Sequence, residues 1–316
     1  MDLSIFIVSY NTRELTRRCL RSILDAKPAA SHEIIAVDNA SSDGSADMIA
    51  REFPGVRLLR SEVNLGFAAA NNLARRQARG ERILLLNPDT RVRGDAIDRL
   101  LAFSIARPEA GITGGRTLYD DGSLNPWSCR GRPTPWGMFC QAVGLTTAFR
   151  MHPLFDPASL GRWQRDSVRE VDVVVGCFLM ITRELWDALG GFDASFFMYG
   201  EETDLCLRAR ARGFRPQVTP DASVVHEGGA SEPAEAAKLV RLFAAHVLLF
   251  RKHWSPTARA FGVSMLHLWA LSRAWGGGLL GLAGRGGARA RGEVWREVWR
   301  RRAEWANGYP PRPELA

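Results

Sequence analysis

The pattern of apolar and polar positions near the start of the chain repeats four times. Short apolar runs stand at residues 3–9, 34–37, 56–59 and 84–86. Each run predicts a buried strand, and a polar loop and then apolar residues at helical spacing follow it. Because strands that alternate with helices form parallel sheets with right-handed crossovers, the pattern predicts an α/β fold with four loops along one sheet edge.

The loop after the fourth run holds the most informative residue. The apolar run stops at Asn87 and Pro88, so Asp89 follows the carboxyl end of a buried strand. Ligands of open α/β sheets bind at that edge. A carboxylate there can hold a divalent cation against a phosphorylated ligand, because hard cations prefer oxygen ligands. The alternative is that Asp89 only caps the next helix.

Polar side chains mark the other three loops as well. The candidates for ligand binding on the four loops are Tyr10, Asn11, Asp38, Asn39, Asn64, Gly66, Asn87 and Asp89. Neither a Gly-x-Gly-x-x-Gly nor a Gly-x-x-x-x-Gly-Lys-Ser/Thr sequence occurs in this half, which disfavours a dehydrogenase or an ATPase. Amide and carboxylate side chains would therefore have to hold a nucleotide.

The second half of the chain adds further candidate chemistry. Residues 121–170, rich in Gly, Pro, Arg and aromatics, predict a long surface excursion, and residues 171–181 predict a strand. Three acids, Glu201, Glu202 and Asp204, then follow aromatic residues, whose bulk raises carboxylate pKa values and suits a general base. The alternative is that these acids simply favour a helix N-terminus. His226 ends another strand, either merely hydrogen-bonded in place or as a metal ligand or diphosphate contact.

Composition limits the class of protein. The 316 residues suggest two domains, or one large α/β domain with an appendage. The five cysteines show no Cys-x-x-Cys spacing and indicate reduced thiols in a cytoplasmic protein. The first ten residues have no basic stretch before an apolar one, so we expect no export signal.

The positive charge is concentrated in the tail. Residues 234–316 hold 14 Lys and Arg against 5 Asp and Glu, while the whole chain carries a formal charge of +8. This favours an anionic membrane surface as the partner of the tail over nucleic acid. Residues 234–253 predict a helix, and residues 261–283 are apolar but too interrupted by His267, Arg273 and glycines to span a bilayer.

Residues 285–302 place Trp295 and Trp299 among arginines, which is typical of a helix lying at the inner membrane face. The alternative is an amphipathic helical pair that packs on the body of the protein or on a second copy.

Five motifs in order resemble family 2 glycosyltransferases of the A-type (GT-A) fold, especially bacterial rhamnosyltransferases. They are Val8-Ser9-Tyr10-Asn11, Val37-Asp38-Asn39-Ala40-Ser41, Asn64-Leu65-Gly66-Phe67, Asn87-Pro88-Asp89-Thr90 and the segment from Phe197 to Cys206. The resemblance covers roughly residues 3–253. It implies a catalytic domain at 1–253, with a nucleotide-sugar-binding half at 3–118 and an acceptor-binding half at 119–253. Residues 254–316 would form a helical membrane-interface extension.

The resemblance also implies roles. Tyr10 and Asn11 would line the base and ribose pocket, Asp38 or Asn39 would bond the pyrimidine, and Asn64 would lie near the ribose or diphosphate. Asp89 matches the last acid of the family's Asp-x-Asp metal motif, and Asn87 stands here in place of the first acid. His226 is therefore a candidate second ligand for Mg²⁺ or Mn²⁺.

The chemistry that the resemblance implies is an inverting single displacement. Glu202 aligns with the family's catalytic base, and Glu201 and Asp204 are the other candidates. The expected reaction moves L-rhamnose from dTDP-L-rhamnose to a lipid-linked or polysaccharide acceptor. The alternatives are a UDP-linked hexose or N-acetylhexosamine as donor, or a non-catalytic scaffold that binds nucleotide sugars at the membrane. A nucleotidyltransferase shares the sheet but usually shows a Gly-rich basic loop, which Ser9-Tyr10-Asn11-Thr12 is not.

Overall fold

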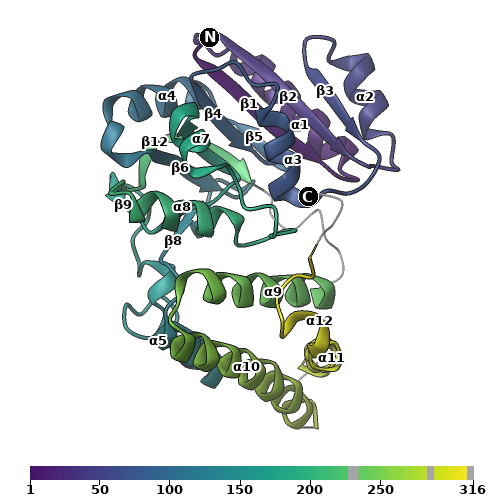
Figure 1. Ribbon diagram of the computed structural model, residues 1–316, viewed down its shortest axis with the longest axis vertical. Helices are drawn as coiled ribbons and strands as arrows, with labels where there is room; N and C mark the ends of the chain where they lie inside the picture. The colour runs from purple at the N-terminus through teal and green to yellow at the C-terminus, as the bar shows by residue number, and fades with distance from the viewer. Residues whose placement is uncertain (227–234, 283–287, 312–316) are drawn as a thin grey trace. The chain divides into compact units, whose positions relative to one another are not determined.

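The computed structural model describes residues 1–226, 235–282 and 288–311 (Figure 1). The chain forms two compact units. The first consists of Met1–Arg130, Trp163–Ala194 and Glu201–Ser231, and the second of Gly131–Arg162, Ser195–Gly200 and Glu232–Ala316. The domain boundary expected after residue 253 falls inside the second unit, between two of its helices.

The first unit is an α/β unit, as expected. Its helices are α1 (Arg13–Ala26), α2 (Ser45–Glu52), α3 (Gly66–Arg75), α4 (Ala96–Ala106), α7 (Arg183–Leu189) and α8 (Glu201–Ala211). Its strands are β1 (Leu3–Ser9), β2 (His32–Asn39), β3 (Arg57–Ser61), β4 (Arg82–Leu86), β5 (Thr90–Val92), β6 (Ile112–Leu118), β7 (Leu124–Asn125), β8 (Cys129–Arg130), β9 (Arg169–Glu170), β10 (Val173–Val174), β11 (Phe178–Thr182) and β12 (Gln217–His226). Short 3-10 turns lie at Pro108–Ala110 and Pro126–Ser128.

The central sheet has the strand order β3-β2-β1-β4-β11-β6-β12-β5. The first four strands in the chain are parallel, which confirms the repeat predicted from the sequence. β11 runs antiparallel between β4 and β6, while β12 is parallel to β6 and antiparallel to β5. The sheet is thus mostly parallel, and the loops after β1 to β4 share one edge.

The apolar runs form strands because both faces of the sheet are covered. All seven residues of β1 and the last four of β4 are buried. Helix α1 presents Cys19, Leu20 and Ile23 to this core at helical spacing. The helix packing explains why continuous apolar runs, rather than alternating ones, mark these strands.

Two details differ from the sequence expectation. The strand predicted at residues 171–181 is two strands, β10 and β11, separated by Val175, Gly176 and Cys177. β10 leaves the main sheet and pairs with β8, so the segment had to break between them. The excursion at 121–170 contains the short strands β7, β8 and β9 as well as helices of the second unit.

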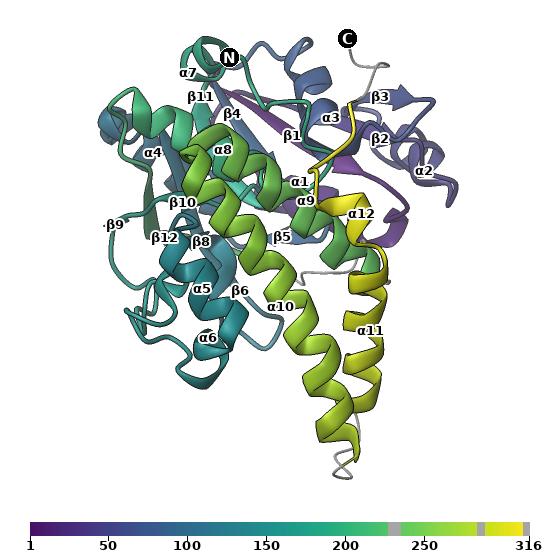
Figure 2. The same cartoon turned by 60° about the horizontal axis from the view of Figure 1, so that its bottom comes forward.

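The second unit is helical (Figure 2). Its helices are α5 (Pro135–Val143), α6 (Leu145–Ala148), α9 (Glu235–His253), α10 (Pro256–Leu282), α11 (Ala288–Arg300) and α12 (Arg302–Trp305), with a 3-10 turn at Pro157–Ser159. Phe243 on α9 lies at its centre, with ring centroids of Trp269, Trp295 and Trp305 at 4.9, 6.1 and 5.0 Å. α9 confirms the helix predicted at residues 234–253.

The tryptophans of α11 make contacts within this unit. Trp295 packs against Trp269 at 5.5 Å between centroids, and Trp299 lies 6.1 Å from the ring of His267. These contacts agree with the alternative of a helical pair packed within the protein. No helix within the described ranges has both the length and the apolar character to cross a bilayer.

Candidate active site

Asp89 lies in a tight turn between two strands. The backbone N–H and the hydroxyl of Thr90 both donate to the Asn87 carbonyl, at 3.1 and 2.5 Å. Helix α4 begins only at Ala96, with Asp95 as its N-cap residue, so Asp89 does not cap it. The Asp89 side chain is only 5% exposed, and its carboxylate contacts another residue instead.

That contact is His226. Residue Thr90 at the start of β5 pairs with His226 at the end of β12, and this pairing brings the imidazole to the carboxylate. The His226 Nε2 atom lies 3.3 Å from the Asp89 Oδ1 atom. Burial lowers the pKa of His226, but the Cys177 sulfur and the Asp89 carboxylate raise it, to about 11. The imidazole therefore pairs with Asp89 as a cation, and a metal ion there would have to displace its proton.

The donor atoms at this turn suit a divalent cation. Asp89 offers a carboxylate, His226 an imidazole nitrogen, and the Asn87 Oδ1 atom is buried without a hydrogen-bond partner in the described part of the chain. Hard cations take oxygen ligands and often bind through one or two carboxylates plus substrate phosphates. Among the described residues no three His, Cys, Asp or Glu form a group that could hold a metal. A cation here would therefore need ligands from a bound phosphate.

The loops after β1, β2 and β3 are bonded to one another. The Asn39 amide donates to Asn64 Oδ1 at 3.0 Å, and the same oxygen accepts the Gly66 N–H at 2.9 Å. Asn11, with φ of 52°, accepts the Ser42 N–H on its Oδ1 at 2.8 Å. The side chains of Asn39, Asn64 and Asn11 thus fasten the loops together.

Asp38 differs from these amides. Its Oδ2 accepts the Ser41 N–H at 3.1 Å, but its Oδ1 is buried and has no partner among the described residues. Tyr10, the residue that follows β1, is 39% exposed. Asp38 and Tyr10 are therefore the groups of these loops with capacity left for a ligand.

The three acids of α8 have distinct surroundings. Asp204 is fully buried, and its Oδ2 accepts from the Arg208 Nε at 2.7 Å. Arg208 also donates to the carbonyls of Leu189 and Gly191, at 2.6 and 2.8 Å. This network joins α8 to the end of α7, so Asp204 is occupied by structure.

Glu201 and Glu202 are neighbours with opposite environments. Burial and then the charge of Glu202 raise the pKa of Glu201 well above its ordinary value, and its Oε2 has no partner among the described residues. Glu202 instead receives a hydrogen bond from Arg130 at 2.8 Å on its Oε1. The same Arg130 nitrogen donates to Thr203 Oγ1 at 2.7 Å. Glu202 is thus the glutamate of the pair with an arginine partner.

The turn of Asp89 and the acids of α8 border one short segment, residues 173–177. On one side, Val173 pairs with Arg130 across β10 and β8, and the Cys206 thiol of α8 donates to the Val174 carbonyl. On the other side, Cys177 contacts His226, and its carbonyl accepts the Asn87 N–H at 3.3 Å. Four residues of chain span at most about 14 Å, so the two groups belong to one region of the first unit. Figure 1 shows α8 and β8 next to each other there.

Sequence reasoning missed Arg130 and Cys177. Arg130 lies in the two-residue strand β8, inside the stretch expected to be a surface excursion, and Cys177 lies in the turn between β10 and β11, inside the segment expected to be one strand. Arg130 stands in a run of Gly, Pro and Arg, and only its pairing to β10 shows where its side chain belongs.

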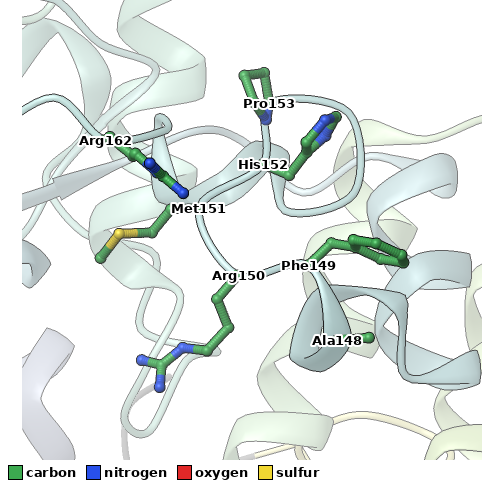
Figure 3. A pocket seen from close by; sticks show the side chains of 7 residues that line it. All are labelled: Ala148, Phe149, Arg150, Met151, His152, Pro153 and Arg162. Carbon is green, nitrogen blue, oxygen red and sulfur yellow. The ribbon is translucent and has the colours of Figure 1, made fainter.

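A surface pocket of about 530 Å³ lies in the second unit (Figure 3). It is lined by Ala148, Phe149, Arg150, Met151, His152, Pro153 and Arg162. No residue predicted from the sequence as a site residue lines it.

Known structures share this architecture. The chain is similar to a mannosyltransferase from Pyrobaculum calidifontis solved with GDP-Man and Mn²⁺, with a TM-score of 0.59 and 19% identity over 96% of this chain and 86% of that one. It is also similar to GalNAc-T7 solved with UDP, GalNAc and Mn²⁺, with a TM-score of 0.57 and 15% identity over 85% and 51% of the two chains. The fold is therefore that of the GT-A glycosyltransferases, as expected from the sequence.

The sequence comparisons define the family. The family model described as "Glycosyl transferase family 2" matches residues 4–162. An N-acetylglucosaminyl-diphospho-decaprenol L-rhamnosyltransferase of Mycobacterium tuberculosis is 30% identical over 244 residues, 71% of this chain and 75% of the relative. The low-salt glycan biosynthesis hexosyltransferase Agl10 of Haloferax volcanii is 28% identical over 66% of this chain and 62% of its own length. The chain belongs to glycosyltransferase family 2.

Proposed function

We propose that this glycosyltransferase moves L-rhamnose from dTDP-L-rhamnose to a hydroxyl of a lipid-linked or polysaccharide acceptor in cell-surface glycan synthesis. The mycobacterial relative, named for an L-rhamnosyl transfer to a lipid diphosphate sugar, supports this choice. The hexosyltransferase relative supports the wider class of reaction.

One observation carries the proposal: Asp89 with His226, and Glu202 with Arg130, border the same segment of chain. A transferase needs a group that holds the diphosphate and a base that faces the acceptor, close enough to act on one sugar. Neither Asp89 as a cap nor Glu202 as a solvated helix start would need to be buried there.

Glu202 acts as the general base in this proposal. Its carboxylate takes the proton of the acceptor hydroxyl while the oxygen attacks the anomeric carbon, and the bond from that carbon to the diphosphate oxygen breaks. A single displacement of this kind inverts the configuration of the sugar. Arg130 holds one carboxylate oxygen, so the other can face the acceptor.

Asp89, His226 and the Asn87 amide oxygen would hold a divalent cation, Mg²⁺ or Mn²⁺. Such a cation would stabilise the negative charge that develops on the leaving diphosphate. Asp38 would bond the pyrimidine through its free oxygen, and Tyr10 would lie against the base or ribose. Asn11, Asn39, Asn64 and Gly66 would shape this pocket through the loop network.

We also propose that the protein works at the inner face of the cell membrane, as a peripheral protein of the cytoplasm. A lipid-linked acceptor would be found there, and the net positive charge of residues 234–316 suits an anionic surface. The proposal includes no nucleic-acid partner.

Donor identity can be tested by thermal shift with dTDP-rhamnose, UDP-glucose, UDP-galactose and UDP-N-acetylglucosamine, each with and without Mn²⁺. The preferred donor should raise the melting temperature most, and only with the metal, because ligands that bind the folded state stabilise it. A larger shift with a UDP-sugar would replace rhamnose by that sugar. If the protein binds the donor but releases no dTDP with any acceptor that is added, a non-catalytic scaffold would be favoured.

A further inference from the structure

Helix α10 exposes an apolar stripe. Phe261, Leu268 and Trp275 are 40%, 38% and 72% exposed. Residues seven apart lie close to two full turns apart, so these three side chains share one side of the helix. The small residue Ser264 is exposed on the same side and leaves the stripe accessible.

The opposite side of α10 is buried. Leu266, Trp269, Ala270 and Ala274 face the interior of the second unit. Ser272 donates to the Ala142 carbonyl at 3.1 Å and Arg273 to Thr147 at 3.0 Å, which fixes α10 against α5 and α6. Figure 2 shows α10 alongside these helices. The helix that carries the stripe is therefore fixed by its packing against the rest of the second unit.

The chain segment that contains the stripe carries charge of one sign. Residues 236–292 contain nine Lys and Arg and neither Asp nor Glu. The second unit as a whole holds 17 basic and 7 acidic residues, whereas the first unit holds 25 and 27. A second copy of this surface would repel the first, while an anionic lipid surface would attract it.

We propose that the Phe261, Leu268 and Trp275 stripe of α10 lies flat in the interface of an anionic bilayer. The inference rests on the membrane location proposed above and names the surface that makes the contact. A helix with an apolar side and a basic setting binds in this way, with the aromatic side chains at the boundary of head groups and acyl chains. Trp295 and Trp299 of α11, which the sequence suggested as anchors, have their ring contacts inside the second unit.

Vesicle sedimentation of the full chain tests the proposal. Vesicles of phosphatidylcholine with about one third phosphatidylglycerol should bind the protein, less so at high salt and less so without the anionic lipid. The triple variant F261Q/L268Q/W275Q should bind about tenfold more weakly or worse, because it removes three apolar side chains from the contact.

The matched control is L24Q/V63Q/I105Q, which changes three apolar residues of the first unit that are 49%, 55% and 55% exposed. It should bind vesicles like the wild type. Equal binding by the α10 variant and the wild type, or an equal loss in both triple variants, would overturn the proposal. So would an α10 variant that separates a dimer in solution while vesicle binding stays unchanged, since the stripe would then join two copies.

A second measurement does not depend on the triple variant. Brominated acyl chains quench the fluorescence of tryptophans that enter the bilayer. Trp275→Phe should still bind such vesicles, but its tryptophan fluorescence should be quenched less than that of the wild type. Equal quenching in the two proteins would place Trp275 outside the bilayer and contradict the inference. The donor-induced thermal shift should stay unchanged in the α10 variant, so a failed docking surface and a failed transferase assignment give different results.

Discussion

A single nitrogen of Arg130 donates to both Glu202 Oε1 and Thr203 Oγ1, at 2.8 and 2.7 Å. The guanidinium thus holds the first turn of α8 to strand β8. A residue from outside the predicted motifs fixes the orientation of the proposed base.

Replacing Arg130 should lower turnover without much change in donor binding. Arg130→Met should reduce kcat by about 10²-fold, since a mispositioned general base loses most of its contribution. Arg130→Lys should recover part of it, because the ammonium keeps the charge but lacks the planar fork. Steady-state kinetics give the readout, and Thr203→Val is the control that leaves the Glu202 contact in place. Equal losses in Arg130→Met and Thr203→Val would mean that the effect is structural.

Glu202 and Asp89 should separate turnover from binding. Glu202→Gln should lower kcat by roughly 10²- to 10⁴-fold while the donor-induced thermal shift stays near that of the wild type. Asp89→Ala should lose both turnover and the Mn²⁺-dependent part of that shift, and EDTA should have the same effect on the wild type. If both variants lost donor binding to the same extent, the separate roles would be wrong.

Glu201 should behave differently from its neighbour. Its pKa is raised in the folded protein, so it keeps its proton where the unfolded chain has lost it. Stability from this group is complete below the ordinary pKa and is lost as the pH rises toward and through the raised value. Glu201→Gln should therefore keep turnover and gain stability over the wild type as the pH increases from about 4 upward. Denaturant unfolding at several pH values measures this, and a constant difference would contradict it.

Asp204 should matter for stability. Asp204→Asn leaves Arg208 without its buried carboxylate partner and should cost about 3 kcal/mol or more of unfolding free energy. Asp95→Asn is the matched control, because Asp95 and Arg99 form an exposed pair of the same spacing, 60% and 54% accessible. That change should alter the unfolding free energy little. Similar costs for both variants would show that burial of the Asp204 pair is unimportant.

The sequence predicted those parts of the fold that follow from local pattern. The run at residues 3–9 became β1 with the same bounds, because a short, mostly apolar segment between polar ends is typical of a strand inside a covered sheet. The sequence named His226 as a candidate second metal ligand beside Asp89, and the two side chains lie 3.3 Å apart; the metal-binding role itself stays a prediction.

Long-range pairing set the limit of prediction. Strand β8 has two residues, Cys129 and Arg130, and its partner β10 lies more than forty positions later. No periodicity can develop over two residues, so the place of Arg130 could not be read from the pattern. The tail shows the same limit, since spacing showed that α11 is amphipathic but not that α9 and α10 supply the rings against Trp295.

The way β5 pairs with β12 has a consequence for engineering. Because Thr90 pairs with His226 in the antiparallel ladder of β5 and β12, the turn that presents Asp89 is held by a strand more than a hundred positions away in the sequence. A chimera that imports only the 87–92 loop from another family member would leave the imidazole out of register with its carboxylate. A chimera should therefore take on the donor preference of the other family member only when residues 217–226 are transferred together with that loop.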